Sequence, residues 1–161
     1  MTEETDRTSE PVEECGLGLE DGAFVELVRD LLGRGFVVRC RARGGSMFPT
    51  FRAGEAITIA PVKGGGVRLG DIVLFASGRG VTAHRVVRVR GEGEGRVFIT
   101  RGDASVTSDE PVEPSAVLGR VVAVERGGRT VPLAGRQVRL MGAVRTAAVH
   151  LFRLVRARFA S

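Results

Sequence analysis

The sequence lacks the residues that build a disulfide framework or a metal cluster. It has two cysteines, Cys15 and Cys40, and two histidines, His84 and His150, in 161 residues. Their spacing fits neither a zinc site nor a network of disulfides. We therefore expect two free thiols, no bound metal and no cofactor.

Long apolar segments are missing too. No stretch approaches the roughly 18 uninterrupted apolar residues that a membrane-spanning helix needs. The acidic N-terminus is also the opposite of a secretory signal peptide. We therefore expect a cytoplasmic protein, with any membrane contact confined to the membrane surface.

Lysine, tryptophan and tyrosine are nearly or wholly absent. Lys63 is the only lysine among the 24 basic residues, and there is no tryptophan and no tyrosine. The net charge of +5 would suit a nucleic acid as partner. The sequence nevertheless offers no aromatic stacking surface and no nucleic-acid-binding motif, so we expect no nucleic-acid partner.

Charge and composition divide the chain into three parts. Residues 1–21 are rich in acids, with Arg7 as their single basic residue, and are expected to form a disordered tail. Residues 22–135 carry the apolar patterns of one domain. Residues 136–161 contain arginines and no acid, and are expected to form a basic amphipathic helix.

The pattern of the central part predicts a mainly β fold. Apolar residues recur at helical spacing over residues 23–32, which predicts one helix ended by the glycines that follow. The many glycines and β-branched residues after it favour short strands joined by turns. Strands are expected within residues 36–44, 55–62, 70–77, 81–91, 96–103 and 116–128. The fold class is a compact β domain with an N-terminal helix.

The C-terminal segment has a helical period with arginines beside an apolar face. One interpretation is a helix that packs on its own domain. The other is a helix in the membrane interface whose arginines reach lipid headgroups. Both remain open from the sequence. The apolar face consists of Met141, Val144, Ala148, Leu151, Val155 and Phe159.

Ser46, in the stretch "RGGSMFPTF", is the first candidate for chemistry. A serine nucleophile needs a base within hydrogen-bond reach and a group that orients the base. Lys63 lies in a flexible glycine run, which is a poor setting for lowering the pKa of an amine. His84 lies within an expected strand, where its geometry can be fixed, and is the better candidate for the base.

Three acids could orient the histidine. Asp71 opens an expected strand, Asp103 closes another, and Asp109 lies in the following loop. Each could equally be a turn residue, because aspartate side chains commonly stabilise turns. Spacing alone does not choose among them.

Four segments in order, "GGSMFPTF", "GDIVLF", "AHRVVRV" and "ITRGDASVTSD", resemble the signal peptidase I family of serine proteases. The resemblance is to its archaeal and endoplasmic-reticulum branch, in which histidine replaces a lysine base, and it spans roughly residues 35 to 125. It implies a β domain of the kind shared with self-cleaving SOS repressors. Those repressors use a Ser–Lys pair, which the position of Lys63 argues against.

The resemblance implies a role for each matched residue. Ser46 is the nucleophile, His84 the general base and Asp109 its partner. Asp103 is a second acid, essential or structural. Gly45 and Met47 are expected beside the substrate and the oxyanion.

The implied activity is endoproteolytic cleavage of a precursor polypeptide after small residues in an Ala-x-Ala pattern. Gly44 stands where many family members carry a hydroxyl residue that assists the oxyanion. The N-terminal membrane anchor of the family is not apparent in this sequence. The alternative that stays open is a catalytically inactive peptide-binding module of the same fold.

Overall fold

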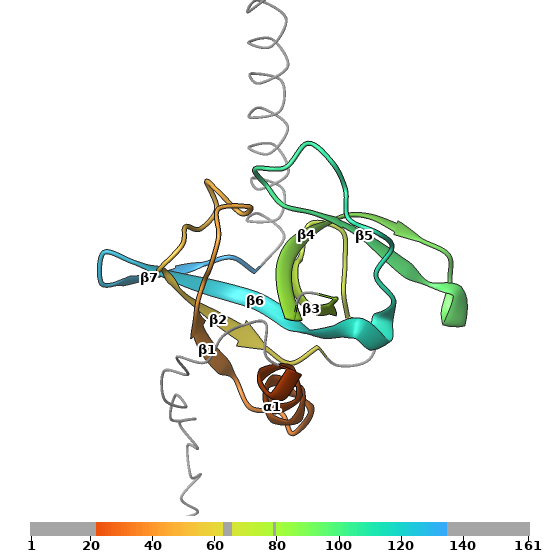
Figure 1. Cartoon of the computed structure of the whole chain (residues 1–161), viewed down its shortest axis with the longest axis horizontal. Coiled ribbons are helices and arrows are strands. Elements are labelled where there is room, and N and C mark those ends of the chain that lie inside the picture. The colour runs from red at the N-terminus through yellow and green to blue at the C-terminus, as the bar shows by residue number, and fades with distance from the viewer. Residues whose placement is uncertain (1–21, 63–65, 79, 135–161) are drawn as a thin grey trace, which may run out of the picture.

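One antiparallel sheet carries most of the structure (Figure 1). The computed structural model describes residues 22–62, 66–78 and 80–134. Strand order in the sheet is β1-β2-β6-β3-β4-β5, with β7 paired to β6. The elements are α1 (Gly22–Gly33), β1 (Val38–Arg41), β2 (Ala56–Ala60), β3 (Ile72–Ser77), β4 (Gly80–Arg90), η1 (Gly93–Gly95), β5 (Val97–Arg101), η2 (Pro114–Ala116), β6 (Val117–Arg126) and β7 (Arg129–Pro132).

The expected mainly β class with an N-terminal helix is confirmed. Strand β7 was not expected. It follows a two-residue turn, Gly127-Gly128, in which both glycines have positive φ, as tight β-hairpins require. Its four residues are all exposed and so show no alternation of buried and exposed positions. The expected acidic tail, residues 1–21, and basic helix, residues 136–161, lie outside the described residues.

Helix α1 closes the core on one side of the sheet. Phe24, Val28 and Leu32 recur every four residues and are buried on one face of the helix. That face packs against β1, β4 and β6 (Figure 1). At Gly119 of β6, a Cβ atom would lie 2.9 Å from Leu32 Cδ1 and 2.7 Å from a methyl of Ile59. Glycine is therefore what lets the helix come this close to the sheet.

Strand β3 is buried on both faces, and it separates two apolar cores. Ile72 and Leu74 belong to the core under α1. Val73 and Phe75 belong to a second core, with Val86 of β4. This explains why β3 is an unbroken apolar run rather than an alternating one.

Strands β1 and β4 each have an edge that lacks a strand neighbour among the described residues. Strand β1 pairs with β2 on one edge only. Strand β4 pairs with β3 from Gly80 to Arg85, but β5 joins its other edge only from Arg85 onward. The first half of β4 thus has an open edge, and the backbone groups there are available to another strand.

An ion pair fastens the loop between β1 and β2 to β6. The Glu55 carboxylate accepts hydrogen bonds from Arg126 Nε at 2.6 Å and from the Arg52 backbone N–H at 2.8 Å. Arg126 also donates to the Thr50 carbonyl oxygen at 3.1 Å. These bonds, chiefly the one from Arg126, lower the pKa of Glu55 from 4.5 to about 2.

We expect this pair to make stability depend on pH. Because the folded-state pKa of Glu55 is lowered, its contribution is complete above about pH 4.5 and is lost as the pH falls through about 2. A Glu55→Gln variant should be less stable than wild type by about 1 kcal/mol at pH 7, since Arg126 is partly exposed. Thermal unfolding should show this difference shrinking below pH 4.5, and Glu94→Gln, an exposed control, should show no difference.

Candidate active site

Ser46 stands in a tight turn of the loop that joins β1 to β2. Gly44 precedes it with a φ of +70°, a conformation that glycine adopts without strain. The Gly45 carbonyl oxygen accepts a hydrogen bond from the Phe48 N–H at 3.1 Å. Met47 is buried in the core and anchors the turn, while Ser46 itself is exposed. The turn therefore holds the serine outward on a fixed base.

His84 of β4 lies against Ser46. Its Nε2 atom is 3.0 Å from Ser46 Oγ. On the other side, the Phe75 ring packs edge-on against the imidazole, with 6.3 Å between ring centroids. The histidine side chain is 12% exposed, so its orientation is set by packing and hydrogen bonds. Of the other basic candidates, Lys63 and His150 lie outside the described residues.

Asp109 completes a hydrogen-bonded chain of three side chains. Its Oδ2 atom is 2.6 Å from His84 Nδ1. The fully buried Thr100 donates its hydroxyl to the same Oδ2 atom at 2.7 Å. The Asp109 backbone N–H also donates to the Thr100 carbonyl oxygen at 2.8 Å. Thr100, which sequence reasoning missed, thus positions the carboxylate that faces the histidine.

Asp103 has a different environment. Its carboxylate is 1% exposed and pairs with Arg85, whose Nε and Nη2 atoms donate at 2.8 and 2.6 Å. The Thr50 hydroxyl also donates to Asp103. Arg85 in turn donates to the Gly70 carbonyl oxygen at 3.0 Å. Asp103 therefore joins the loop after β5 to β4 and to the Ser46 loop, away from the hydrogen-bonded chain.

Asp71 fills a turn, as one sequence interpretation had it. Its Oδ2 atom accepts a hydrogen bond from the Arg68 backbone N–H at 2.9 Å, and Arg120 lies 3.4 Å away. Asp71 is nearly fully buried. Of the three candidate acids, the structure brings only Asp109 to the histidine.

Gly102 is a further residue of the site, and sequence reasoning missed it. A Cβ atom at this position would lie 2.7 Å from the Ser46 carbonyl oxygen and 3.1 Å from His84 Nε2. The Ala104 N–H donates to the same Ser46 carbonyl oxygen at 2.8 Å. The loop after β5 therefore presses directly on the serine and the histidine, and only a glycine fits at residue 102.

We expect Gly102→Ala to lower both activity and stability. The added methyl group would force Ser46 and His84 apart, and a shift of about 1 Å in a catalytic group costs on the order of 10²-fold in rate. Crowding should cost stability about 1–3 kcal/mol. Gly95→Ala is the matched control, because nothing lies within 4 Å of a Cβ there. Equal activity of the two variants, measured as kcat, would contradict the tight fit at Gly102.

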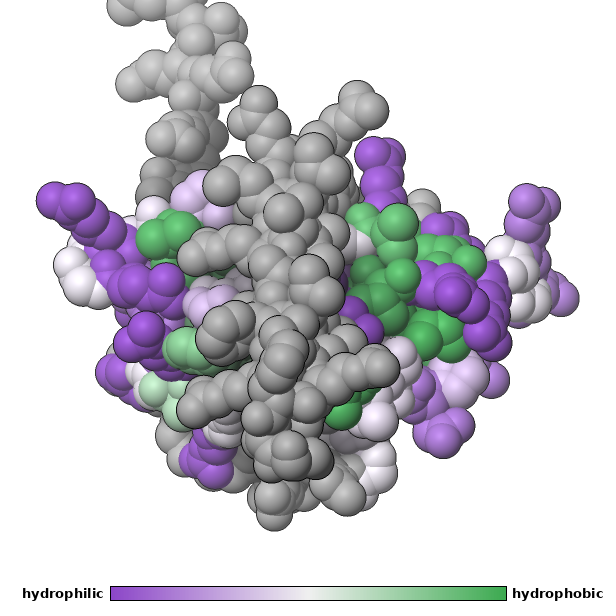
Figure 2. Space-filling model, turned by 90° about the horizontal axis from the view of Figure 1, so that it is seen from above, coloured by the Kyte–Doolittle hydropathy of each residue, from purple (hydrophilic) through white to green (hydrophobic). Residues whose placement is uncertain are grey.

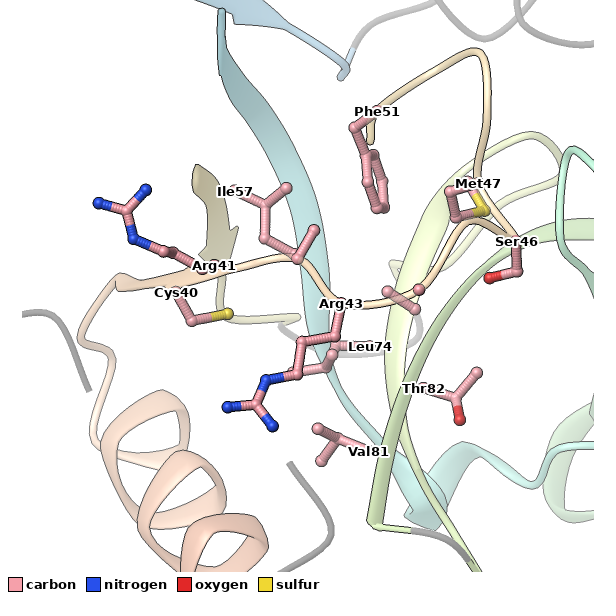
Figure 3. Close-up of a pocket in the computed structure, with 13 residues that line it drawn as sticks. Cys40, Arg41, Arg43, Ser46, Met47, Phe51, Ile57, Leu74, Val81 and Thr82 are labelled. Atoms are coloured by element: carbon pink, nitrogen blue, oxygen red, sulfur yellow. The ribbon is translucent and has the colours of Figure 1, made fainter. Parts of the chain in front are cut away.

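A groove of about 380 Å³ begins at Ser46 (Figure 3). It runs between residues 40–44 on one side and Val81–Ala83 of β4 on the other. These are the open edges of β1, with the residues that follow it, and of β4. Figure 3 shows the Ser46 hydroxyl at one end of the groove, with Met47 and Phe51 close to it. The buried thiol of Cys40 lines the same groove.

A second hollow, of about 730 Å³, lies on the other face of β4. His84 and Asp109 line it together with Phe75 of β3. Two exposed acids, Glu110 and Glu113, also line it, and among the described residues no lysine or arginine does. The two hollows beside the serine and histidine therefore differ in charge.

The loops around the site expose apolar side chains. Phe48, beside Ser46, is 44% exposed, and Val106, in the loop after β5, is 63% exposed. Both loops stand at the top of the molecule in Figure 1. Figure 2 looks down on this side and shows hydrophobic residues interspersed with hydrophilic ones. The surroundings of Ser46 can thus contact both apolar and polar parts of a ligand.

Comparison of the chain with protein-family models, with curated proteins and with solved structures finds no match. None of the helices in residues 22–62, 66–78 and 80–134 is long and apolar enough to cross a membrane. Within the same residues, no three His, Cys, Asp or Glu side chains gather as metal ligands.

Proposed function

We propose that this chain is a serine endopeptidase of the signal peptidase type, which cleaves a polypeptide after a small residue by acyl transfer. The observation that carries the proposal is the continuous hydrogen-bonded chain from Ser46 through His84 to Asp109. A serine, a histidine and a buried or partly buried acid in this order form the catalytic triad of serine hydrolases. The open groove that starts at the serine supplies a place for a peptide.

In the proposed reaction, Ser46 Oγ attacks a peptide carbonyl carbon while His84 Nε2 takes the hydroxyl proton. The tetrahedral intermediate collapses as the C–N bond breaks, and Nε2 gives the proton to the leaving amine. Water then enters, loses a proton to Nε2 and attacks the acyl carbon. The acyl C–O bond breaks, Nε2 returns the proton to Ser46 Oγ, and the acid leaves. Asp109 holds the Nδ1–H tautomer and stabilises the imidazolium formed in each half of the reaction.

The oxyanion needs donors near Ser46. Among the described residues no acceptor takes the Ser46 backbone N–H, which leaves it available to the developing negative charge. Gly44 offers no hydroxyl for this task. We therefore assign the oxyanion to backbone donors of the Gly45–Ser46 turn.

A substrate strand would fit the groove by adding to the two open edges. An extended peptide can pair with exposed strand edges through its main chain, while alternate side chains enter pockets. Cys40 and Ala42 on one edge and Val81 and Ala83 on the other face the apolar core under the groove. Side chains of the substrate that point inward, two residues apart, would meet this apolar surface. Two alanines fit such a position, in line with the Ala-x-Ala pattern.

The proposed setting is the cytoplasm or the surface of a membrane. The possible contact with anionic lipid through residues 136–161 rests on the sequence, because that segment lies outside the described residues. The proposed partner is a precursor or leader peptide, and neither a cofactor nor a nucleic acid enters the reaction.

Mass spectrometry of digested peptides tests the proposal. Purified protein should cut a peptide that contains Ala-Gln-Ala within an extended polar sequence, on the carboxyl side of the second alanine. A peptide with both alanines replaced by leucine should stay intact. Binding of the first peptide without any cleavage would favour the inactive peptide-binding module instead.

A further inference from the structure

The charged side chains along the groove lie on its outward side, opposite the apolar core. Along residues 40–43, burial alternates: Cys40 and Ala42 are buried, and Arg41 and Arg43 are exposed. On β4, Val81 and Ala83 pack on the core, so Thr82 faces the other way. A strand laid between these edges continues the same alternation. Every second substrate side chain would thus point outward, between the arginines and Thr82.

Arg43 is the charged group of the groove nearest in sequence to Ser46. Among the described residues it has no carboxylate or carbonyl partner. Figure 3 shows its guanidinium beside Val81, on the side of the groove away from Ser46. Arg41 differs, since it donates to the Gly54 carbonyl oxygen at 3.2 Å. Among the described residues no acid lines the groove, and none there neutralises the Arg43 charge.

We propose that Arg43 selects an acidic residue at the second position before the cut, the x of the Ala-x-Ala pattern. This inference rests on the proposed function, because it assumes that the peptide enters as a strand with both alanines inward. The x side chain then points outward and passes Arg43, where a carboxylate forms a charge-assisted hydrogen bond. A lysine or arginine at x meets a like charge.

The charge of the second hollow limits this preference to one position. Glu110 and Glu113 lie on the far side of Thr82 from the groove. An acidic substrate side chain is therefore attracted at Arg43 and repelled farther across β4. The expected preference is for a single acid at x rather than for an acidic peptide in general.

Three peptides that differ only at x test the inference: Ala-Glu-Ala, Ala-Gln-Ala and Ala-Lys-Ala. For wild type, kcat/KM should be about tenfold higher for the glutamate than for the lysine peptide at low salt, and the ratio should fall as salt is added. Arg43→Glu should reverse the order. Arg90→Glu, an exposed charge reversal at the far end of β4, should keep the wild-type order.

Two results would separate this inference from the proposed function. If wild type cleaves all three peptides equally well, Arg43 does not select charge, although the protease remains. If it cleaves none, the proposed function fails. In that case, affinities of the same peptides for the Ser46→Ala variant still test Arg43: the glutamate peptide should bind about tenfold more tightly than the lysine peptide, and equal affinities would overturn the inference. Thermal unfolding checks that each variant is folded.

Discussion

An Asp109→Asn variant is expected to lose about 10⁴-fold in kcat while its melting temperature changes little. Thr100 and His84 contact the same Oδ2 atom of Asp109, and the amide nitrogen of asparagine can take that place if the Thr100 hydroxyl turns to accept from it. The amide group, turned toward His84, would donate to Nδ1 and so move the ring proton to Nε2. In that tautomer Nε2 cannot take the proton of Ser46, which lies 3.0 Å away. The geometry survives, and the base is disabled.

Asp103→Asn should have the opposite profile. Arg85 is buried and would lose its charged partner, and breaking a buried ion pair costs about 3–5 kcal/mol of stability. The melting temperature should fall clearly. The kcat of the molecules that remain folded should drop much less than in Asp109→Asn, because Asp103 does not contact His84.

Steady-state kinetics and thermal unfolding of the two variants make the comparison, with kcat corrected for the folded fraction. A large loss of kcat in Asp103→Asn without a loss of stability would show that Asp103, and not Asp109, orients His84. The same conclusion would follow from near-normal kcat in Asp109→Asn.

The sequence predicted the local elements well because their signals are local. Alternation over residues 36–44 and the turn glycines locate β1, and helical spacing locates α1. Strand β7 was missed because its residues are all exposed, so its place depends on pairing with β6 rather than on its own pattern. Which edges remain open also depends on pairing across the sheet. The groove could not be foreseen for that reason.

Residue types and motifs indicated which residues could form the site, but spacing did not indicate which of them contact one another. Ser46 and His84 stand out by their motifs. Asp103 and Asp109 are six residues apart and carry the same chemistry, so spacing did not choose between them; the family resemblance implied Asp109, and the structure places that carboxylate 2.6 Å from His84 Nδ1. Thr100 shows no motif of its own.

Two further groups act through contacts that no local pattern encodes. Arg85 meets Asp103 from a different strand, 18 residues away in the sequence. Gly102 looks like an ordinary turn glycine, and its φ is not in the region that demands glycine. The reason for glycine there is the closeness of Ser46, which becomes apparent only once the chain is folded.

The most direct test of the proposed mechanism is the cleavage rate of Ser46→Ala. Removing the hydroxyl removes the atom that forms the acyl-enzyme, so kcat should fall on the order of 10⁶-fold, and His84→Ala should fall by a similar factor because the two residues act as a unit. His150→Ala is the control, because it removes the other histidine of the sequence and should keep the wild-type kcat. Thermal unfolding should show that the Ser46→Ala variant is folded, since Ser46 is exposed.

The measurement is the rate at which Ser46→Ala cuts the Ala-Gln-Ala peptide, followed by mass spectrometry at equal concentrations of variant and wild type. The proposed mechanism predicts no detectable cleavage over hours. Cleavage at the same bond, at a rate within a few-fold of wild type, would contradict it.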